Sequence, residues 1–410
     1  MIIKVLDFII FWAIILIPFS MAIAPAPMNV FFGLLLFSFL LKKLIKRQKI
    51  FIGSPVNMPF MFFFIVSAVS VVNSVSCHDS FRGLLRLIQY WALFLIMAEE
   101  IKEPKHVRRI VIAIISAAVL LSIDALWQVI SGRDFIRGNS PIVNIGLTRA
   151  TASFPDANVL GVYLSAVAPL IIVLAFYYFK NNKKVITLSA VLLVLSGIAL
   201  TYSRPTLLAI YVVLLLLGAV RKNKVLIYAL IVFTLLAPFI APRSVKDWAR
   251  QMEYNPVRFM CNDDRIAIYR NSLRMIEAHP VIGVGVNTFM KNYKEYKESP
   301  EYRGIVTSDY IYAHNNFLHM AGEVGILGLG VFLWFLYSLF RASSLAYVKL
   351  KDPLLKNVSL GLILCLAAFL INGLTESSLY YSRVAAIFWY LVGFSLSLIK
   401  FTDADKSRSG

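Results

Sequence analysis

The sequence is poor in charged residues and almost free of cysteine. Only 15% of its 410 residues are Asp, Glu, Lys or Arg, whereas a soluble globular chain has about 25%. This shortage argues against a water-soluble enzyme and against a disordered protein, and three cysteines cannot form a disulfide framework. The sequence also lacks a Walker loop, a His-Glu-x-x-His motif, a Cys-x-x-Cys pair and a Gly-x-Ser-x-Gly elbow, so nothing in it indicates nucleotide-driven chemistry.

Apolar residues are what the chain has in abundance. They make up 59% of it, and its mean hydropathy is +0.74. A helix needs about 20 mostly apolar residues to cross a bilayer. About twelve such stretches are present: 5–23, 27–41, 58–76, 81–98, 109–130, 157–179, 185–202, 205–220, 225–240, 314–340, 357–374 and 384–399. The sequence therefore predicts an all-α polytopic membrane protein with about 12 transmembrane helices.

The distribution of basic residues predicts how these spans are oriented. The net charge is +19, which in a membrane protein is first explained by loop bias rather than by nucleic acid, with anionic lipid or phosphate ligands as a second explanation. If the N-terminus is cytoplasmic, the cytoplasmic segments hold 23 Lys and Arg and the short external loops only 5. We therefore expect both termini in the cytoplasm.

One connection is much longer than the others. Residues 241–313 form an external segment with 11 Lys or Arg and 9 Asp or Glu, and apolar residues at helical spacing predict an amphipathic helix over 264–279. The predicted organisation is thus transmembrane helices 1–9 over 1–240, an external loop domain over 241–313, transmembrane helices 10–12 over 314–400 and a cytoplasmic tail over 401–410.

The tight external turn Tyr202-Ser203-Arg204-Pro205 carries the first candidate site. Pro205 suits the first turn of the following helix, and the free amides of that turn together with the Arg204 guanidinium would face an anion at the membrane interface. The competing interpretation is an arginine that merely reaches toward lipid headgroups.

The long loop carries two further candidates. Arg265 and Tyr269 lie one helical turn apart and should share a face, although Arg265 could simply pair with a loop carboxylate. His314 and Asn315 stand where the loop re-enters the membrane, and a neutral His314 could accept a proton there. For His319 we favour an ordinary hydrogen-bonded role, because it does not share a face with His314.

The remaining external residues give weaker signals. Arg149 precedes the turn Phe154-Pro155-Asp156-Ala157-Asn158. Arg82 and Arg86 lie at i and i+4 and should point to a cavity or to headgroups. Cys77 and Cys261 could pair, though nothing in their spacing demands it. His78 and Glu376 are minor candidates.

Taken together, these motifs resemble the O-antigen ligase/polymerase family of bacterial membrane glycosyltransferases. The matching pieces are Arg149 with Phe154 to Asn158, Ser203-Arg204, Arg265 with Pro280 to Gly285, and His314-Asn315 with Glu323-x-Gly325. The resemblance covers roughly residues 140–340. Asp156 departs from the pattern, because family members often carry Asn directly after the proline, so we assign it no role.

The resemblance implies a GT-C-like fold and a metal-independent transfer that needs no cofactor and no nucleotide sugar. The donor would be a glycan on undecaprenyl diphosphate, and the acceptor would be a sugar hydroxyl of lipid A–core at the periplasmic face of the bacterial inner membrane. In this interpretation His314, Arg204 and Arg265 are catalytic, and the substrate-binding residues are Arg149, Tyr202, Ser203, Tyr269 and Asn315. Membrane lipids are expected partners, and nucleic acid is not.

Three functions remain open from the sequence. We favour the ligase, because a single dominant external loop resembles ligases. A polymerase that joins lipid-linked repeat units shares the same chemistry and is the main alternative, and other surface-glycan transferases are possible. A lipid or sugar transporter is less favoured, because the polar motifs gather at one face and no matching halves are visible.

Overall fold

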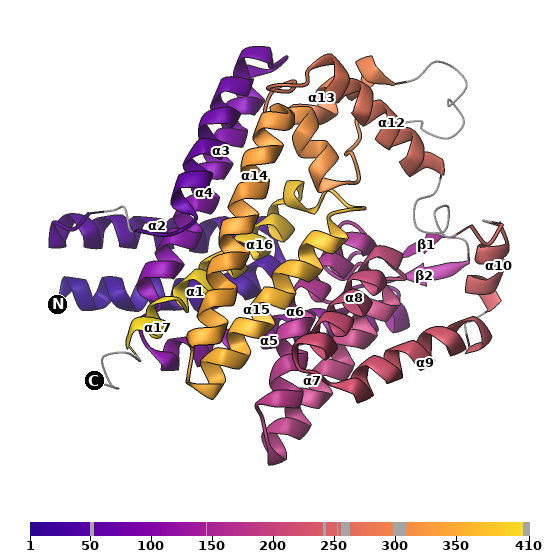
Figure 1. Ribbon diagram of the computed structural model, residues 1–410, viewed down its shortest axis with the longest axis horizontal. Coiled ribbons are helices and arrows are strands. Elements are labelled where there is room, and N and C mark those ends of the chain that lie inside the picture. The colour runs from indigo at the N-terminus through magenta and orange to yellow at the C-terminus, as the bar shows by residue number, and fades with distance from the viewer. Residues whose placement is uncertain are drawn as a thin grey trace.

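A computed structural model shows a helical protein in which long apolar helices pack around a buried centre (Figure 1). It describes residues 1–49, 53–144, 146–240, 243–251, 253–255, 263–297 and 309–404. About 79% of the chain is helical, and within the described residues nine helices are long and apolar enough to cross a membrane. The all-α polytopic class is therefore confirmed.

The helices follow the predicted stretches closely. The nine candidate spans are α1 (Ile2–Ile23), α2 (Pro25–Lys46), α4 (Cys77–Glu100), α5 (Pro104–Ser131), α6 (Ala157–Tyr177), α7 (Asn181–Leu200), α14 (Asn316–Lys349), α15 (Pro353–Asn372) and α16 (Ser382–Ser397), the last continuing toward α17 (Lys400–Ala404). Three shorter apolar helices are α3 (Asn57–Ser70), extended by the 3-10 turn η1 (Val71–Asn73), α8 (Arg204–Val220) and α9 (Lys224–Ile240). These three coincide with predicted spans but are short, so the count of twelve stays a prediction.

The segments between the spans add small elements. The long loop contains α10 (Arg243–Gln251), α12 (Asp263–Ala278) and α13 (Phe289–Tyr296), and α12 confirms the amphipathic helix expected over 264–279. A 3-10 turn, η3 (Ser378–Tyr380), precedes α16. The sequence did not predict the antiparallel hairpin of β1 (Ile142–Asn144) and β2 (Leu147–Arg149), which pairs Ile142 with Arg149.

The core is built where small residues let helices approach closely. Of the most apolar stretch of α6, 94% is buried, and α6 packs mainly against α15. A Cβ on Gly361 of α15 would lie 2.9 Å from the Cα of Leu170 on α6. A Cβ on Gly393 of α16 would likewise lie 2.7 Å from the Cα of Phe94 on α4. Such close backbone approach is the usual means by which membrane helices gain dispersion energy.

Ion pairs join the carboxyl ends of α2 and α4. At the end predicted to be cytoplasmic, the buried ammonium group of Lys42 lies 2.5 Å from Asp7 and 2.6 Å from Glu100, and Lys400 donates to the carbonyl of Glu99. Both chain termini lie at the left of the view, whereas α12 and α13 lie at the top (Figure 1). The orientation of the spans in the membrane stays a prediction.

A break in α14 joins the long loop to the membrane helices. Gly325 has φ 71° inside α14, a conformation that glycine adopts without strain. The turn segment 280–285 lies against this break, where Val284 N–H donates to Gly322 O at 2.9 Å and Ile326 N–H donates to Pro280 O at 2.8 Å. Backbone hydrogen bonds therefore connect the two glycine-rich motifs, 280–285 and 322–328.

Candidate functional site

The loop that follows α15 is locked to the start of α14. Asn316 N–H donates to Gly373 O at 2.7 Å, and its side-chain amide donates to Ser378 Oγ at 2.8 Å. Its side-chain oxygen accepts from Leu379 N–H at 2.9 Å. The buried Asn316 thus fixes residues 373–379 beside the residue pair that precedes α14, and this contact brings His314 to Glu376.

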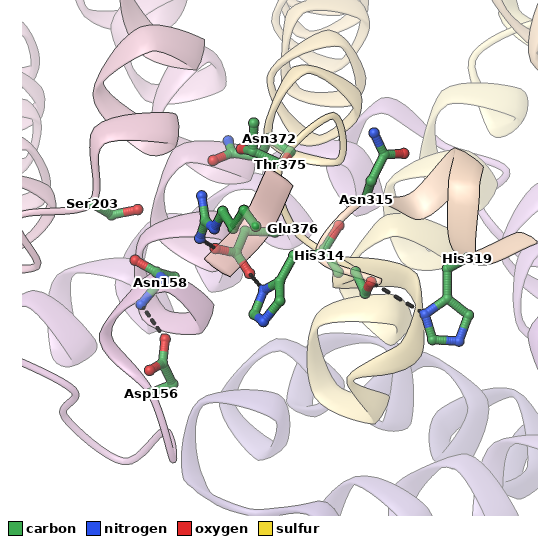
Figure 2. Close-up of polar contacts among 12 residues, drawn as sticks. Asp156, Asn158, Ser203, His314, Asn315, His319, Asn372, Thr375 and Glu376 are labelled. Atoms are coloured by element: carbon green, nitrogen blue, oxygen red, sulfur yellow. Dashed lines mark hydrogen bonds and ion pairs between the residues drawn. The ribbon is translucent and has the colours of Figure 1, made fainter. Parts of the chain in front are cut away.

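Glu376 lies at the centre of the site, between a histidine and an arginine (Figure 2). Its Oε2 lies 3.3 Å from His314 Nδ1, and its Oε1 accepts a hydrogen bond from the Arg265 guanidinium. The Glu376 side chain is 4% exposed, against 12% for Arg265 and 25% for His314. The carboxylate is therefore buried behind two partners, and the imidazole is the more accessible member.

The charge state of Glu376 determines which tautomer of His314 fits. Burial raises the pKa of Glu376, but the hydrogen bond from His314 and the charge of Arg265 outweigh burial, so its pKa lies below its ordinary value. An ionised carboxylate only accepts hydrogen bonds. Nδ1 of His314 must then carry the proton in this contact, and Nε2 is left with a lone pair that can accept another proton.

Arg149 extends the site toward α6 and α7. Its Nε donates to Thr201 O at 2.8 Å, and its terminal nitrogen donates to Asn158 Oδ1 at 2.7 Å. Burial lowers the pKa of Arg149, the carboxylates of Asp156 and Glu376 oppose that change, and the charge of Arg265 adds to it. Arg149, Arg265 and Glu376 therefore act on one another electrostatically.

Asp156 has a structural role at this edge of the site. It is the N-cap of α6, and its side chain accepts from Asn158 N–H at 2.7 Å. Asp and Asn are equally good N-caps. The aspartate that departs from the family pattern thus holds in place the asparagine that Arg149 contacts.

The turn 202–205 reaches the same region through α15. Tyr202 has φ 47°, and Ser203 is the N-cap of α8, whose first residue is Arg204. The hydroxyl of Thr206 lies 2.9 Å from Ser203 Oγ and 3.2 Å from Asn372 Oδ1. Asn372 ends α15, four residues before Glu376, and Figure 2 shows Asn372 above Glu376 and Ser203 to its left.

Tyr269 and Asn315 hold the backbone around the histidine. The Tyr269 hydroxyl donates to His314 O at 3.0 Å, so Tyr269 and Arg265 both face the site from α12, as their spacing predicted. The Asn315 side chain caps α14 by accepting from two backbone amides, and its Nδ2 donates to Leu374 O at 2.8 Å. The backbone of His314 itself has φ 48°. The side-chain oxygen and the side-chain nitrogen of Asn315 are thus both hydrogen-bonded to backbone atoms.

His319 belongs to a separate buried cluster. Its Nδ1 lies 3.2 Å from Ser377 Oγ, its Nε2 lies 3.4 Å from Glu323 Oε1, and its ring stacks on Tyr380 at a centroid distance of 3.5 Å. It is 1% exposed, and Figure 2 shows it apart from the His314–Glu376 pair. The ordinary hydrogen-bonded role expected for His319 agrees with these contacts.

Sequence reasoning undervalued Glu376. The structure brings His314, Arg265 and Tyr269 into direct contact around residues 374–376, and it links Arg149 and Ser203 to them. Glu376 was only a minor candidate, because its one sequence signal was a lone acidic residue between the last two predicted spans. Cys261 lies outside the described residues, so its proposed pairing with Cys77 stays a prediction. In the part of the chain described, no group of three His, Cys, Asp or Glu is arranged to hold a metal ion.

These features define a helical membrane protein with a cationic, histidine-containing site at one end. Residues 189–333 match the family model described as O-antigen ligase. The chain thus carries an O-antigen ligase family segment, and the resemblance to the O-antigen ligase/polymerase family is confirmed. The segment includes Arg204, Arg265 and His314, whereas Arg149 and Glu376 lie outside it. No curated protein matches the chain.

Proposed function

We propose that the protein is an O-antigen ligase that moves a glycan from undecaprenyl diphosphate to a sugar hydroxyl of lipid A–core, at the periplasmic face of the inner membrane. The observation that carries this proposal is the contact of His314 with a buried carboxylate beside Arg265, in a chain with the O-antigen ligase segment. The transfer needs a base for the acceptor and a cationic environment for the leaving group, and the site supplies both.

In the proposed reaction the acceptor hydroxyl attacks the anomeric carbon of the donor sugar. The new glycosidic bond forms as the bond from that carbon to the diphosphate oxygen breaks, and the hydroxyl proton passes to Nε2 of His314. Glu376 keeps the other ring nitrogen protonated and stabilises the imidazolium that results, which is the role of the carboxylate in a base–orienter pair. General-base assistance of this kind contributes about 10²–10⁴ in rate.

The leaving diphosphate gains negative charge as the bond breaks. The guanidiniums of Arg149, Arg204 and Arg265 would stabilise that charge, with Arg204 at the amino end of α8, where backbone amides also favour an anion. Losing one well-placed donor of this type costs about 10²–10³ in rate. Arg265 already donates to Glu376, so it would both hold the carboxylate in place and add positive charge.

The test uses the purified full chain, a polyprenyl-diphosphate-linked glycan and candidate acceptors. We expect a new glycosidic product from wild type, a loss of about 10²–10⁴ in rate for His314→Ala and of about 10²–10³ for Arg204→Ala. Arg133→Ala is the matched control, because Arg133 is an exposed arginine outside the site, and it should transfer normally. Near-normal transfer by His314→Ala at normal expression would contradict the assignment of the base.

The acceptor used decides between the two glycan-transfer functions. Product on lipid A–core supports the ligase, whereas product only on a second lipid-linked repeat unit supports the polymerase. A transporter would yield no product. The gathering of the polar residues at one end, rather than along the spans, argues against that last function.

A further inference from the structure

A cavity of about 280 Å³ lies between α1, α2, α4 and the first turn of α16. Met21 of α1, Phe32 of α2, Leu93 of α4 and Ala386 of α16 give it an apolar wall. Its volume is at the low end of the range for ligand pockets, which is about 300–1,000 Å³. It therefore fits one segment of a hydrocarbon chain rather than a whole lipid.

Polar groups stand at the mouth of this cavity. Arg86 of α4 and Asn29 of α2 are both exposed and line it, together with Gln89 and Ser382. Within the described part of the chain no carboxylate pairs with Arg86, whereas Arg82, one turn earlier on α4, lies 3.9 Å from Asp79. An arginine beside an apolar slot is complementary to a lipid whose head group carries a phosphate.

Exposed apolar residues flank the cavity residues Asn29, Arg86 and Gln89 in the chain. Val30 on α2 is 60% exposed, and Leu85 and Ile88 on α4 are 64% and 45% exposed. In a membrane-spanning chain such outward apolar residues face lipid. A lipid chain could therefore enter sideways from the bilayer, between two helices that contact each other only sparsely.

Two tyrosines connect this cavity to the site around Glu376. The rings of Tyr312 and Tyr381 lie 4.9 Å apart, and Tyr381 immediately precedes the cavity residue Ser382. Burial raises the pKa of Tyr312, and the Arg86 guanidinium lies near enough to oppose that rise. Burial and the carboxylate of Glu376 both raise the pKa of Tyr381. The tyrosine pair thus lies beside the cavity residue Ser382, where the charges of Arg86 and Glu376 both act on it.

We propose that this cavity holds the hydrocarbon chain of a second lipid substrate, the acceptor, whose phosphate-bearing head group is bound by Arg86. The inference rests on the proposed function, because a transfer between two lipid-linked glycans needs two lipid sites. The donor diphosphate is assigned to Arg149, Arg204 and Arg265, which leaves Arg86 for the other lipid. A phosphate at Arg86 would let the attached sugar reach across the tyrosine pair toward His314.

Lipid binding is measured directly on the detergent-purified full chain by native mass spectrometry. The probes are dioleoyl phosphatidic acid, dioleoylglycerol, which has the same chains without phosphate, and farnesyl diphosphate as a short donor-like lipid. Arg86→Ala removes the cation, Asn29→Trp fills the mouth from an exposed position, and Arg82→Ala is the matched control on the same helix. Since a hydrogen bond to a charged group is lost, we expect Arg86→Ala to bind phosphatidic acid about tenfold to a hundredfold more weakly.

The expected pattern is specific. Asn29→Trp should also weaken phosphatidic acid binding. Arg82→Ala should bind phosphatidic acid within about twofold of wild type, because its charge lies outside the cavity. Dioleoylglycerol should bind wild type and Arg86→Ala equally well. Farnesyl diphosphate should be weakened by Arg204→Ala and not by Arg86→Ala. In transfer assays Arg86→Ala should raise the acceptor KM and leave the donor KM unchanged.

Several results would overturn the inference. If Arg82→Ala and Arg86→Ala weakened phosphatidic acid binding equally, the lipid would be attracted to the surface charge in general. If Arg86→Ala and Asn29→Trp both left its binding unchanged, the lipid would bind elsewhere. Displacement of phosphatidic acid by equimolar inorganic phosphate would indicate a simple anion site. His314→Ala should lose transfer yet bind phosphatidic acid normally, so failure of the catalytic proposal and failure of this one are distinguishable.

Discussion

Replacing Glu376 with glutamine isolates the part that its charge plays. Arg265 can only donate hydrogen bonds, so the side-chain oxygen of the new glutamine would turn to it. The side-chain nitrogen of that glutamine would then face Nδ1 of His314, which could no longer carry a proton there. The imidazole would hold its proton on Nε2, the nitrogen that does not contact Glu376 in the structure. The substitution keeps the shape of the side chain but reverses the tautomer of the base.

The magnitude follows from what the wrong tautomer removes. A base whose lone pair points at the introduced glutamine cannot take the acceptor proton, so the general-base contribution of about 10²–10⁴ is lost. At about 1.36 kcal/mol for each factor of ten, that loss raises the barrier by about 2.7–5.4 kcal/mol. Because Glu376 is 4% exposed, water cannot readily take its place as the orienting acceptor.

The assay is transfer by the purified full chain, with kcat/KM followed as a function of pH. Glu323→Gln is the matched control, since Glu323 is also a buried carboxylate beside a histidine, His319, and does not contact His314. We expect Glu376→Gln to fall by the stated factor while Glu323→Gln stays within about tenfold, the range of structural effects of about 1.4 kcal/mol. Transfer by Glu376→Gln within about threefold of wild type, less than the smallest general-base contribution, would refute the tautomer argument.

Three further outcomes concern stability, measured by thermal unfolding of the detergent-solubilised chain. Arg383→Ala should cost at least about 3 kcal/mol, because its buried guanidinium donates to Ser153 O at 2.7 Å and to the carbonyl end of α1, where Ile23 O lies 3.2 Å away, and charged hydrogen bonds are worth about 1.5–3 kcal/mol each. Equal stability of Arg383→Ala and the exposed control Arg133→Ala would contradict this. Gly325→Ala should lower the free energy of unfolding by about 3 kcal/mol or more, since its Cβ would lie 2.0 Å from Val281 O at φ 71°. Its control, Gly330→Ala, lies in open space on the same helix and should raise that free energy by about 0.5–1 kcal/mol. The reverse order would show that the break in α14 is not required. The pKa of Glu376 is lowered from 4.5 in the folded chain. The stability difference between wild type and Glu376→Gln should therefore be constant above about pH 4.5, decline below it and vanish once the pH falls through the folded pKa. A difference that vanishes near pH 7 would be inconsistent with that shift.

Much of the fold could be predicted because a bilayer leaves few choices. Runs of apolar residues must become helices there, and the basic residues separate the two ends, so stretches such as 157–179 closely match α6 at Ala157–Tyr177. The hairpin β1–β2 was missed because its strands have three residues each, too few for an alternating pattern to be visible. The break at Gly325 was missed for a related reason: the hydropathy of α14 is continuous across it.

The site could be predicted only in part, because sequence patterns report local spacing and not contacts between loops. Arg265 and Tyr269 share a helix face, so their common direction followed from helical geometry. The partner of His314 could not be found in this way, since Glu376 lies 62 residues further along the chain. The contact depends on Asn316, whose three hydrogen bonds hold the two loops together, and an asparagine at a helix start predicts no more than a cap.

The charge balance of the site favours a substrate that is itself anionic. Arg149, Arg265 and Arg204 at the start of α8 contribute three positive charges, against the two carboxylates of Glu376 and Asp156. A helix amino end adds roughly half a positive charge of its own. Ion pairing with the arginines explains how the Glu376 carboxylate can be buried. The positive charge that remains is costly unless an anionic group of the bound substrate offsets it. A carrier for neutral sugars would gain nothing from this excess, whereas a leaving diphosphate would be stabilised by it most strongly as its bond breaks.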